Sequence, residues 1–200
     1  MKLFFATGNK GKVKELEALV QGMDIEVQYM ADYPDFVAPP ETGSTFKENA
    51  QIKARSACEY TGLPSLADDS GLVVDALGGA PGVYSARYSG ENATSESNNE
   101  KLLDAMKDVP DGERTARFCA VLCLSYPDGQ DLFSEGTVEG EILREYVGTN
   151  GFGYDPLFFV PEKGKGMAEM TMEEKNSISH RSRAFNGLCK ALNSCYSEKA

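Results

Sequence analysis

The stretch LADDSGL, residues 66–72, places two adjacent aspartates between apolar residues. A buried carboxylate costs free energy unless it is paired with a cation or bound to a metal. Neighbouring side chains of an extended segment point to opposite faces, so Asp68 and Asp69 can face one cleft only if the chain bends between them. Ser70-Gly71 offers a bend just after the pair, and a turn with helix-capping duties is the alternative interpretation of the two aspartates.

Predicted strands and helices alternate on both sides of this stretch. Apolar residues recur at helical spacing over residues 13–20, 46–58, 95–107 and 185–195. Strands are predicted over residues 3–6, 25–30, 116–126 and 132–133. Thr45, followed three residues later by Glu48, fits a capping box at the start of the second helix. The pattern predicts an α/β protein with a mixed sheet.

Length and charge limit the class of protein. A chain of 200 residues is long enough for a sizeable core and is most simply one domain, residues 1–200. The formal net charge of −11 disfavours nucleic acids and anionic membranes as partners, whereas a small anionic ligand needs only a few cations. Because the chain has neither an apolar run of about 20 residues nor a signal-peptide pattern, we expect a cytoplasmic protein without a membrane partner.

Cysteine and histidine usage excludes several metal sites. The five cysteines are an odd number and form no C-x-x-C pair, so neither a disulfide framework nor a zinc site is indicated. The only histidine is His180, which excludes the H-E-x-x-H motif.

The segment TGNKGK, residues 7–12, follows the first predicted strand and opens a helix. Backbone N–H groups at such a junction, together with the helix dipole, bind phosphate, and Lys10 and Lys12 add positive charge. The segment lacks the spacing of a Walker A loop, and an ordinary strand-to-helix turn explains it equally well.

A magnesium site would need a second carboxylate beside the aspartate pair. Mg²⁺ keeps several waters and takes one or two carboxylates together with substrate phosphates. Glu41, in the Pro-rich loop before the second helix, is the candidate.

Two later segments have features of a ligand site. In GFGYDP, residues 151–156, the glycines let a ligand approach the backbone and the aromatics offer a stacking face; a Gly-rich hairpin with core aromatics is the alternative. EKNSISHR, residues 174–181, places Lys175, His180 and Arg181 at a predicted helix start that Ser179 could cap. A solvated basic surface is the alternative there.

Five motifs in order resemble one family, the inosine triphosphate pyrophosphatase-like enzymes in their bacterial form. The resemblance covers the chain almost end to end and rests on FATGNKGKVKEL, ETGSTFKENAQIKA, LADDSGLVVDALGGAPGVYSARYSG, GFGYDPLFFVP and EKNSISHRSRA. It implies a Maf-related fold, with a mixed central sheet flanked by helices and two lobes with the active-site cleft between them.

The resemblance also implies an activity. Noncanonical purine nucleoside triphosphates (ITP, dITP and XTP) would be hydrolysed to the monophosphate and pyrophosphate, which keeps them out of DNA and RNA. It implies Mg²⁺ as cofactor and a homodimer.

Site residues follow from the matched motifs. Asp69 would be the proton acceptor and a metal ligand, Glu41 the other metal contact, and Asp68 a supporting one. The triphosphate would be bound by Thr7, Gly8, Asn9, Lys10, Gly11 and Lys12, with Lys53 near the phosphates. The other nucleotide contacts implied are Ser70, Phe152, Gly153, Tyr154, Asp155, Lys175, His180 and Arg181.

Two alternatives remain open from the sequence. A Maf-like nucleotide diphosphatase would have a related architecture and a preference for methylated or pyrimidine nucleotides. A non-catalytic nucleotide-binding sensor would bind ITP without releasing pyrophosphate, although the presence of both Asp69 and Glu41 favours an enzyme.

Overall fold

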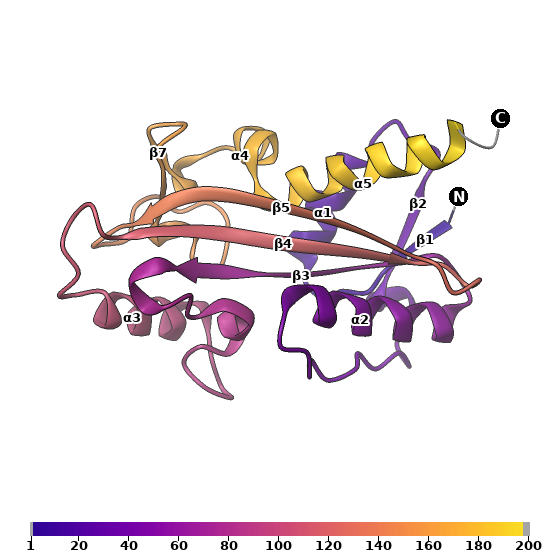
Figure 1. Cartoon of the computed structure of the whole chain (residues 1–200), viewed down its shortest axis with the longest axis horizontal. Helices are drawn as coiled ribbons and strands as arrows, with labels where there is room; N and C mark the ends of the chain where they lie inside the picture. Colours follow the sequence, from indigo (N-terminus) through magenta and orange to yellow (C-terminus); the bar gives the residue numbers. More distant parts are fainter. Residues whose placement is uncertain (1, 198–200) are drawn as a thin grey trace. The chain divides into compact units, whose positions relative to one another are not determined.

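Figure 1 shows the computed structural model of the chain, which describes residues 2–197. The strands are β1 (Lys2–Phe5), β2 (Glu26–Tyr29), β3 (Ser65–Val74), β4 (Thr115–Ser125), β5 (Asp131–Ile142), β6 (Phe158–Val160) and β7 (Lys165–Gly166). The α-helices are α1 (Lys10–Leu19), α2 (Phe46–Thr61), α3 (Ser95–Ala105), α4 (Met172–Ile178) and α5 (His180–Ser197). Short 3-10 helices cover Met30–Asp32, Asp75–Leu77, Gly82–Arg87, Asp155–Leu157 and Met167–Glu169. Within this part of the chain, no helix is both long enough and apolar enough to cross a membrane.

The strands of residues 2–197 form one seven-stranded sheet in the order β2-β1-β3-β4-β5-β6-β7. β1 pairs in parallel with β2 and with β3, whereas β6 pairs antiparallel with both β5 and β7. The sheet is therefore mixed, and the predicted α/β class is confirmed.

The chain divides into two compact units. Unit 1 comprises Met1–Asp69, Ala120–Gly136 and Arg181–Ala200, and unit 2 comprises Ser70–Cys119 and Thr137–His180. The division is compatible with the two lobes expected from the sequence. The single domain over residues 1–200 and the cleft stay predictions.

Unit 1 has apolar side chains on both faces of its strands. On one face, Leu66 and Leu122 pack with Leu16 of α1 and Phe185 of α5. On the other face, Ala67 packs with the small residues of α2. Figure 1 shows the same arrangement, with α1 and α5 on one side of these strands and α2 on the other. Because β3 is buried from both sides here, any polar residue on it needs a partner within the protein.

Unit 2 has a core of its own. Leu102 and Met106, at the end of α3, are fully buried with Phe158 of β6 and with Leu72 and Val74 of β3. The helix predicted from the apolar spacing over residues 95–107 is thereby confirmed as α3. The same core contains Tyr154, from the Gly-rich loop, and Ile178, from α4.

The start of α2 confirms half of the predicted capping box. Thr45 Oγ1 accepts a hydrogen bond from the Glu48 backbone N–H at 3.1 Å. The Glu48 carboxylate accepts instead from the N–H and the hydroxyl of Ser44, at 2.7 and 2.8 Å. Both Ser44 and Thr45 therefore stabilise the helix start, because each engages Glu48.

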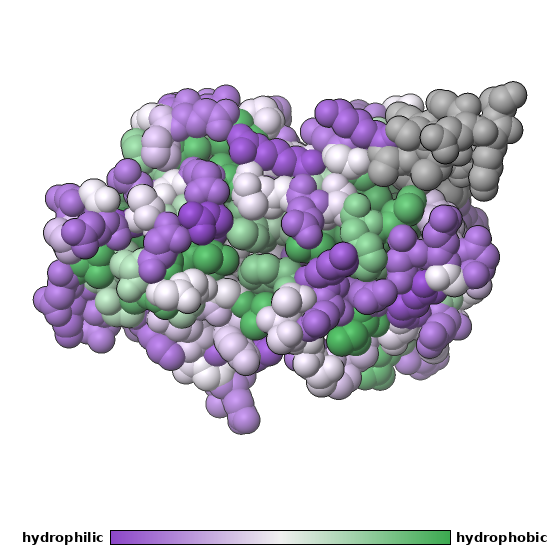
Figure 2. All heavy atoms as spheres, in the orientation of Figure 1, coloured by the Kyte–Doolittle hydropathy of each residue, from purple (hydrophilic) through white to green (hydrophobic). Residues whose placement is uncertain are grey.

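The thiols of Cys58, Cys123 and Cys189 are not in disulfides. The side chains of Cys195 and of Leu192, predicted on the apolar face of the last helix, lie outside those described. Hydrophilic side chains cover much of the face shown in Figure 2, in keeping with the net charge.

Candidate active site

Asn9 shapes the loop between β1 and α1. Its Oδ1 accepts hydrogen bonds from the N–H groups of Gly11 and Lys12 at 2.8 and 3.3 Å, and its own N–H donates to Thr7 Oγ1 at 3.2 Å. The predicted strand, loop and helix are confirmed. The Asn9 cap already occupies two of the first N–H groups of the helix, so phosphate binding by Thr7, Gly8 and the following residues stays a prediction.

Asp68 and Asp69 lie within one uninterrupted strand, β3. The bend predicted at Ser70-Gly71 is wrong, because the strand continues through both residues to Val74. The alternation of strand side chains therefore sends the two carboxylates to opposite faces. Asp68 shares the face of Leu66, toward α1 and α5, and Asp69 shares the face of Ala67, toward α2.

Asp68 belongs to a buried network of charges. Its Oδ1 accepts from Lys12 Nζ at 2.8 Å and its Oδ2 from Arg181 Nε at 3.1 Å. Arg181 also donates through a terminal guanidinium nitrogen to Glu15, one turn after Lys12 on α1. Burial alone would raise the pKa of Asp68, but the charges of Lys12 and Arg181 hold that pKa well below its usual range. Asp68 and Glu15 together therefore neutralise Lys12 and Arg181, and Asp68 bridges the two cations.

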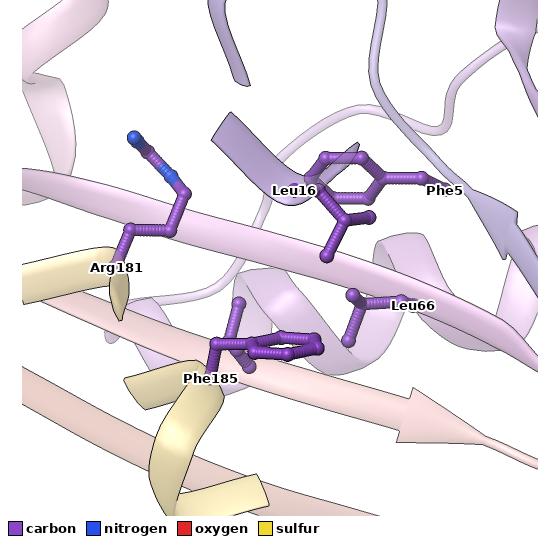
Figure 3. Close-up of a pocket in the computed structure, with 6 residues that line it drawn as sticks. Phe5, Leu16, Leu66, Arg181 and Phe185 are labelled. Carbon is purple, nitrogen blue, oxygen red and sulfur yellow. The ribbon is translucent and has the colours of Figure 1, made fainter. Parts of the chain in front are cut away.

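Arg181 lies beside a small apolar pocket in unit 1. Its other lining residues are Phe5, Leu16, Leu66, Leu122 and Phe185. Figure 3 shows the guanidinium end of Arg181 directed away from Phe185 and Leu66. Since the rest of the lining is hydrocarbon, the pocket is a gap in the core packing with no groups suited to a nucleotide. The predicted contact between Arg181 and the base stays a prediction.

On the other face of β3, Lys53 joins Asp69 to Glu41. Lys53 Nζ lies 2.8 Å from Glu41 Oε1 and 3.0 Å from Asp69 Oδ1. The carboxylates of Asp69 and Asp68 raise the pKa of Lys53 against the effect of its burial. Two carboxylates therefore meet at one cation, on the face opposite the contacts of Asp68.

Asn49 supports this cluster and was not among the predicted site residues. It is fully buried, and its Nδ2 donates to Asp69 Oδ2 at 3.2 Å. Its Oδ1 accepts from the Gly43 N–H at 2.8 Å, which ties down the loop that carries Glu41. Asn49 and Lys53 lie one helical turn apart, so their side chains share one face of α2. This spacing is the signal in the sequence that could have identified Asn49 as a site residue.

The residues present fit a magnesium ion. Glu41 and Asp69 direct oxygens to one point, occupied by the Lys53 ammonium, and hard oxygen ligands suit Mg²⁺. Burial raises the pKa of Asp69 despite the Lys53 charge beside it, which indicates that the cluster lacks positive charge. Among residues 2–197 no group of three His, Cys, Asp or Glu side chains could hold a metal. The remaining ligands would be water and substrate oxygens.

In unit 2, Asp155 organises the Gly-rich loop. Its Oδ2 accepts from the Phe152 N–H at 2.9 Å and from Lys175 Nζ at 2.8 Å. Lys175 Nζ also lies 4.6 Å from the centroid of the Phe152 ring. Because the Phe152 side chain remains 38% exposed, it offers an open aromatic face beside a cation.

Tyr154 fits the alternative interpretation of this loop, in which the aromatics belong to the core, and its contact with the nucleotide stays a prediction. Its ring lies in the core of unit 2, its hydroxyl donates to the Ser85 carbonyl at 2.7 Å, and burial raises its pKa. Its ring therefore cannot serve as a stacking face, and Phe152 is the aromatic of this loop that can.

The remaining predicted residues lie on α4, at the start of α5 and on β3. The basic segment belongs to two helices: Lys175 is on α4, and α5 begins at His180 directly after Ser179. The buried His180 ring stacks on Phe118 with centroids 5.1 Å apart, which sets the plane of the imidazole. Ser70 is half-buried on β3, one residue after Asp69.

The sequence model of the Ham1 family matches residues 3–191 of the chain. The chain belongs to the Ham1 family. The family membership predicted from the five motifs is thereby confirmed.

Two relatives illustrate how close the similarity to other Ham1 proteins is. The dITP/XTP pyrophosphatase of Geobacter sulfurreducens is 55% identical over 184 residues, which cover 92% of each chain. The dITP/XTP pyrophosphatase of Escherichia coli (strain K12) is 53% identical over 193 residues, 96% of this chain and 98% of the relative.

Solved Ham1 structures share the fold. The Coxiella burnetii HAM1 protein has a TM-score of 0.88 at 43% identity, and the Staphylococcus aureus Ham1 protein has a TM-score of 0.86 at 42% identity. Each alignment covers 97% of this chain and 99% of the other. The predicted mixed sheet flanked by helices is therefore the fold of this Ham1 protein.

Proposed function

We propose that this protein is a nucleoside triphosphate diphosphatase that hydrolyses ITP, dITP and XTP to the nucleoside monophosphate and pyrophosphate. The observation that carries the proposal is the near full-length similarity to dITP/XTP pyrophosphatases at 53–55% identity. The carboxylate pair that meets at Lys53 supplies the matching chemistry. We place the protein in the cytoplasm as a homodimer, as the family resemblance implies.

The triphosphate end of the substrate is assigned to unit 1. A triphosphate is highly anionic near neutral pH, so it needs cations placed beforehand. Lys53 contributes one, and Lys12 lies at the helix start that follows the Asn9 cap. In the segment from Thr7 to Lys12, the Asn9 cap engages the N–H groups of Gly11 and Lys12, so the N–H groups of Gly8 and Lys10 are assigned to the phosphates at the positive end of α1.

Glu41 and Asp69 would hold the magnesium ion. When bound, the ion polarises phosphoryl oxygens and lowers the pKa of coordinated water. Asp69 is assigned as the proton acceptor for the attacking water, because its carboxylate lies beside the position proposed for the magnesium ion, where a coordinated water would be. Asn49 holds Asp69 Oδ2 and thereby fixes the plane of that carboxylate.

The base is assigned to residues of unit 2. The Phe152 ring can stack on the purine, and Lys175 and His180 are donors suited to the oxygen at C6 of hypoxanthine and xanthine. Adenine presents an amino group at that position, which would face another donor. Such a mismatch between buried polar groups discriminates strongly.

Pyrophosphate release from ITP, dITP, XTP, GTP and ATP, with Mg²⁺ and after chelation, tests the proposal. We expect kcat/KM for ITP and XTP to exceed that for ATP by at least about a hundredfold, and chelation to abolish turnover. Release of inorganic phosphate, or full activity after chelation, would contradict it. A preference for pyrimidine nucleotides would favour a Maf-like enzyme, and ITP binding without pyrophosphate release would favour a sensor.

A further inference from the structure

The buried face of α3 contains an asparagine that sequence patterning did not predict there. Asn99 is 2% exposed, one turn before Leu102, which belongs to the apolar core of unit 2. Asparagine has weaker helix propensity than leucine, and its amide loses hydration on burial. The residue therefore needs a specific partner to offset its cost.

One partner of Asn99 is the backbone of the Gly-rich loop. Its Nδ2 donates to the Gly153 carbonyl at 2.9 Å. The Asn99 side chain also interacts with the Tyr146 hydroxyl, where it opposes the burial that raises the pKa of Tyr146. A hydrogen bond of this kind contributes little net stability, so an apolar side chain that fills the same space would serve helix packing almost as well.

The contact restrains the loop where it is most free to turn. Gly153 has a φ of +63°, and nothing lies within 4 Å of a Cβ built on it, so neighbouring side chains do not restrain this residue. In a trans peptide the carbonyl and the following N–H point in opposite directions. A Gly153 carbonyl held against Asn99 therefore directs the Tyr154 N–H away from α3.

Two other hydrogen bonds complete the restraint. Asp155 holds the Phe152 N–H, and the Tyr154 hydroxyl holds the Ser85 carbonyl. Asn99 restrains the peptide between these two points. The segment that carries the exposed Phe152 ring is thus fixed before any ligand arrives, which lowers the entropy lost on binding.

We propose that Asn99 is a positioning residue for base recognition: it sets the Gly153–Tyr154 peptide and, through it, the Phe152 face that receives the purine. The assignment rests on the proposed function, because it takes a purine nucleotide as the ligand of this loop. Asn99 itself contacts the loop backbone.

Asn99→Leu tests the assignment, because it removes the donor and fills the same part of the core. We expect KM for ITP to rise about three- to tenfold with kcat within twofold, as for loss of one hydrogen bond that preorganises a site. The melting temperature should change by no more than a few degrees, because leucine keeps this part of the core filled and one hydrogen bond contributes little net stability. A purely structural role predicts the reverse: a lower melting temperature and an unchanged KM.

Asn99→Asp is the second variant, because it keeps the shape of the side chain while replacing the donor with an acceptor that faces a carbonyl. KM should rise at least as much as in Asn99→Leu. Glu100→Gln, an exposed change on the same helix, is the matched control and should leave KM unchanged. If both Asn99 variants fold and keep the wild-type KM, the assignment of Asn99 is overturned, whereas the proposed function is not affected. Absence of pyrophosphate release by the wild-type protein would instead overturn the proposed function, and the assignment with it.

Discussion

Asp68 and Asp69 are the same residue type at adjacent positions of one strand, yet their surroundings differ. On the α1 and α5 face, Asp68 meets two cations, Lys12 and Arg181, and its side chain is 1% exposed. On the α2 face, Asp69 shares the single cation Lys53 with Glu41. The pKa of Asp68 is lowered and the pKa of Asp69 is raised.

The difference shows how one strand can separate a structural charge from a reactive one. A carboxylate with a full set of cations holds its neighbours in place and is a weak base. A carboxylate short of positive charge is a stronger base and has room for a further cation. Alternation along the strand lets these two environments lie one residue apart.

Asp69→Asn should have the largest effect on turnover. Removal of the proton acceptor lowers kcat for ITP by about a thousandfold, within the range of general base catalysis. The fold should tolerate the change, because Lys53 keeps Glu41 as its partner. Steady-state kinetics and thermal unfolding measured on the same preparation check both expectations. Turnover near that of the wild type would mean that Asp69 is not the base.

The main effect of Asp68→Asn should be a lower free energy of unfolding. The substitution leaves Lys12 and Arg181 buried without their shared carboxylate, which costs about 3 kcal/mol in the free energy of unfolding. Urea unfolding measures the loss. A variant as stable as the wild type would contradict the view that Asp68 neutralises this network.

The acid dependence of stability distinguishes the two aspartates further. Because the folded pKa of Asp68 is lowered, the stability it contributes is present above its unfolded pKa, about 4, and is lost as pH falls below it. Asp69, with a raised folded pKa, contributes stability at low pH that is lost as pH rises through that pKa. On acidification, Asp68→Asn should therefore lose less stability than the wild type, and Asp69→Asn should lose more.

Phe152→Ala should have the smallest of these effects and no consequence for the aspartate network. Loss of a stacking face raises KM for ITP about tenfold while kcat is kept, as for other base–aromatic contacts. Thermal stability should change little, since the ring is 38% exposed. Tyr84→Ala, a loss of another exposed aromatic of unit 2, is the control. Equal KM values in the Phe152→Ala and Tyr84→Ala variants would show that Phe152 does not contact the base.

Local patterns predicted most elements because helix and strand periods depend on near neighbours. The strand-loop-helix start and the Thr45 cap followed from residue spacing. The bend at Ser70-Gly71 was wrong, because glycine is tolerated within a strand that tertiary packing buries from both sides. Glu41 and the aspartate pair were candidates from the sequence itself, Lys53 was selected through the family resemblance, and the structure brings Lys53, Glu41 and Asp69 together.

Buried polar residues on helices escaped prediction. Asn49 and Asn99 resemble solvent-facing residues in a one-dimensional pattern, yet both are buried and hydrogen-bonded to distant segments. Glu15 pairs with Arg181 across 166 positions of the chain, and no spacing rule reaches that far.

The sequence alone determined that Asp68 and Asp69 would face opposite ways if they lie on one extended strand, because the period of two is a property of the backbone. The structure decided that they do, since β3 runs without a break from Ser65 to Val74. Only the tertiary structure decided which cations each carboxylate meets. Arg181 reaches Asp68 across 113 positions, and Lys53 reaches Asp69 across 16. The reason is that side-chain charges interact through space, so the folded path of the chain sets their partners and their pKa values.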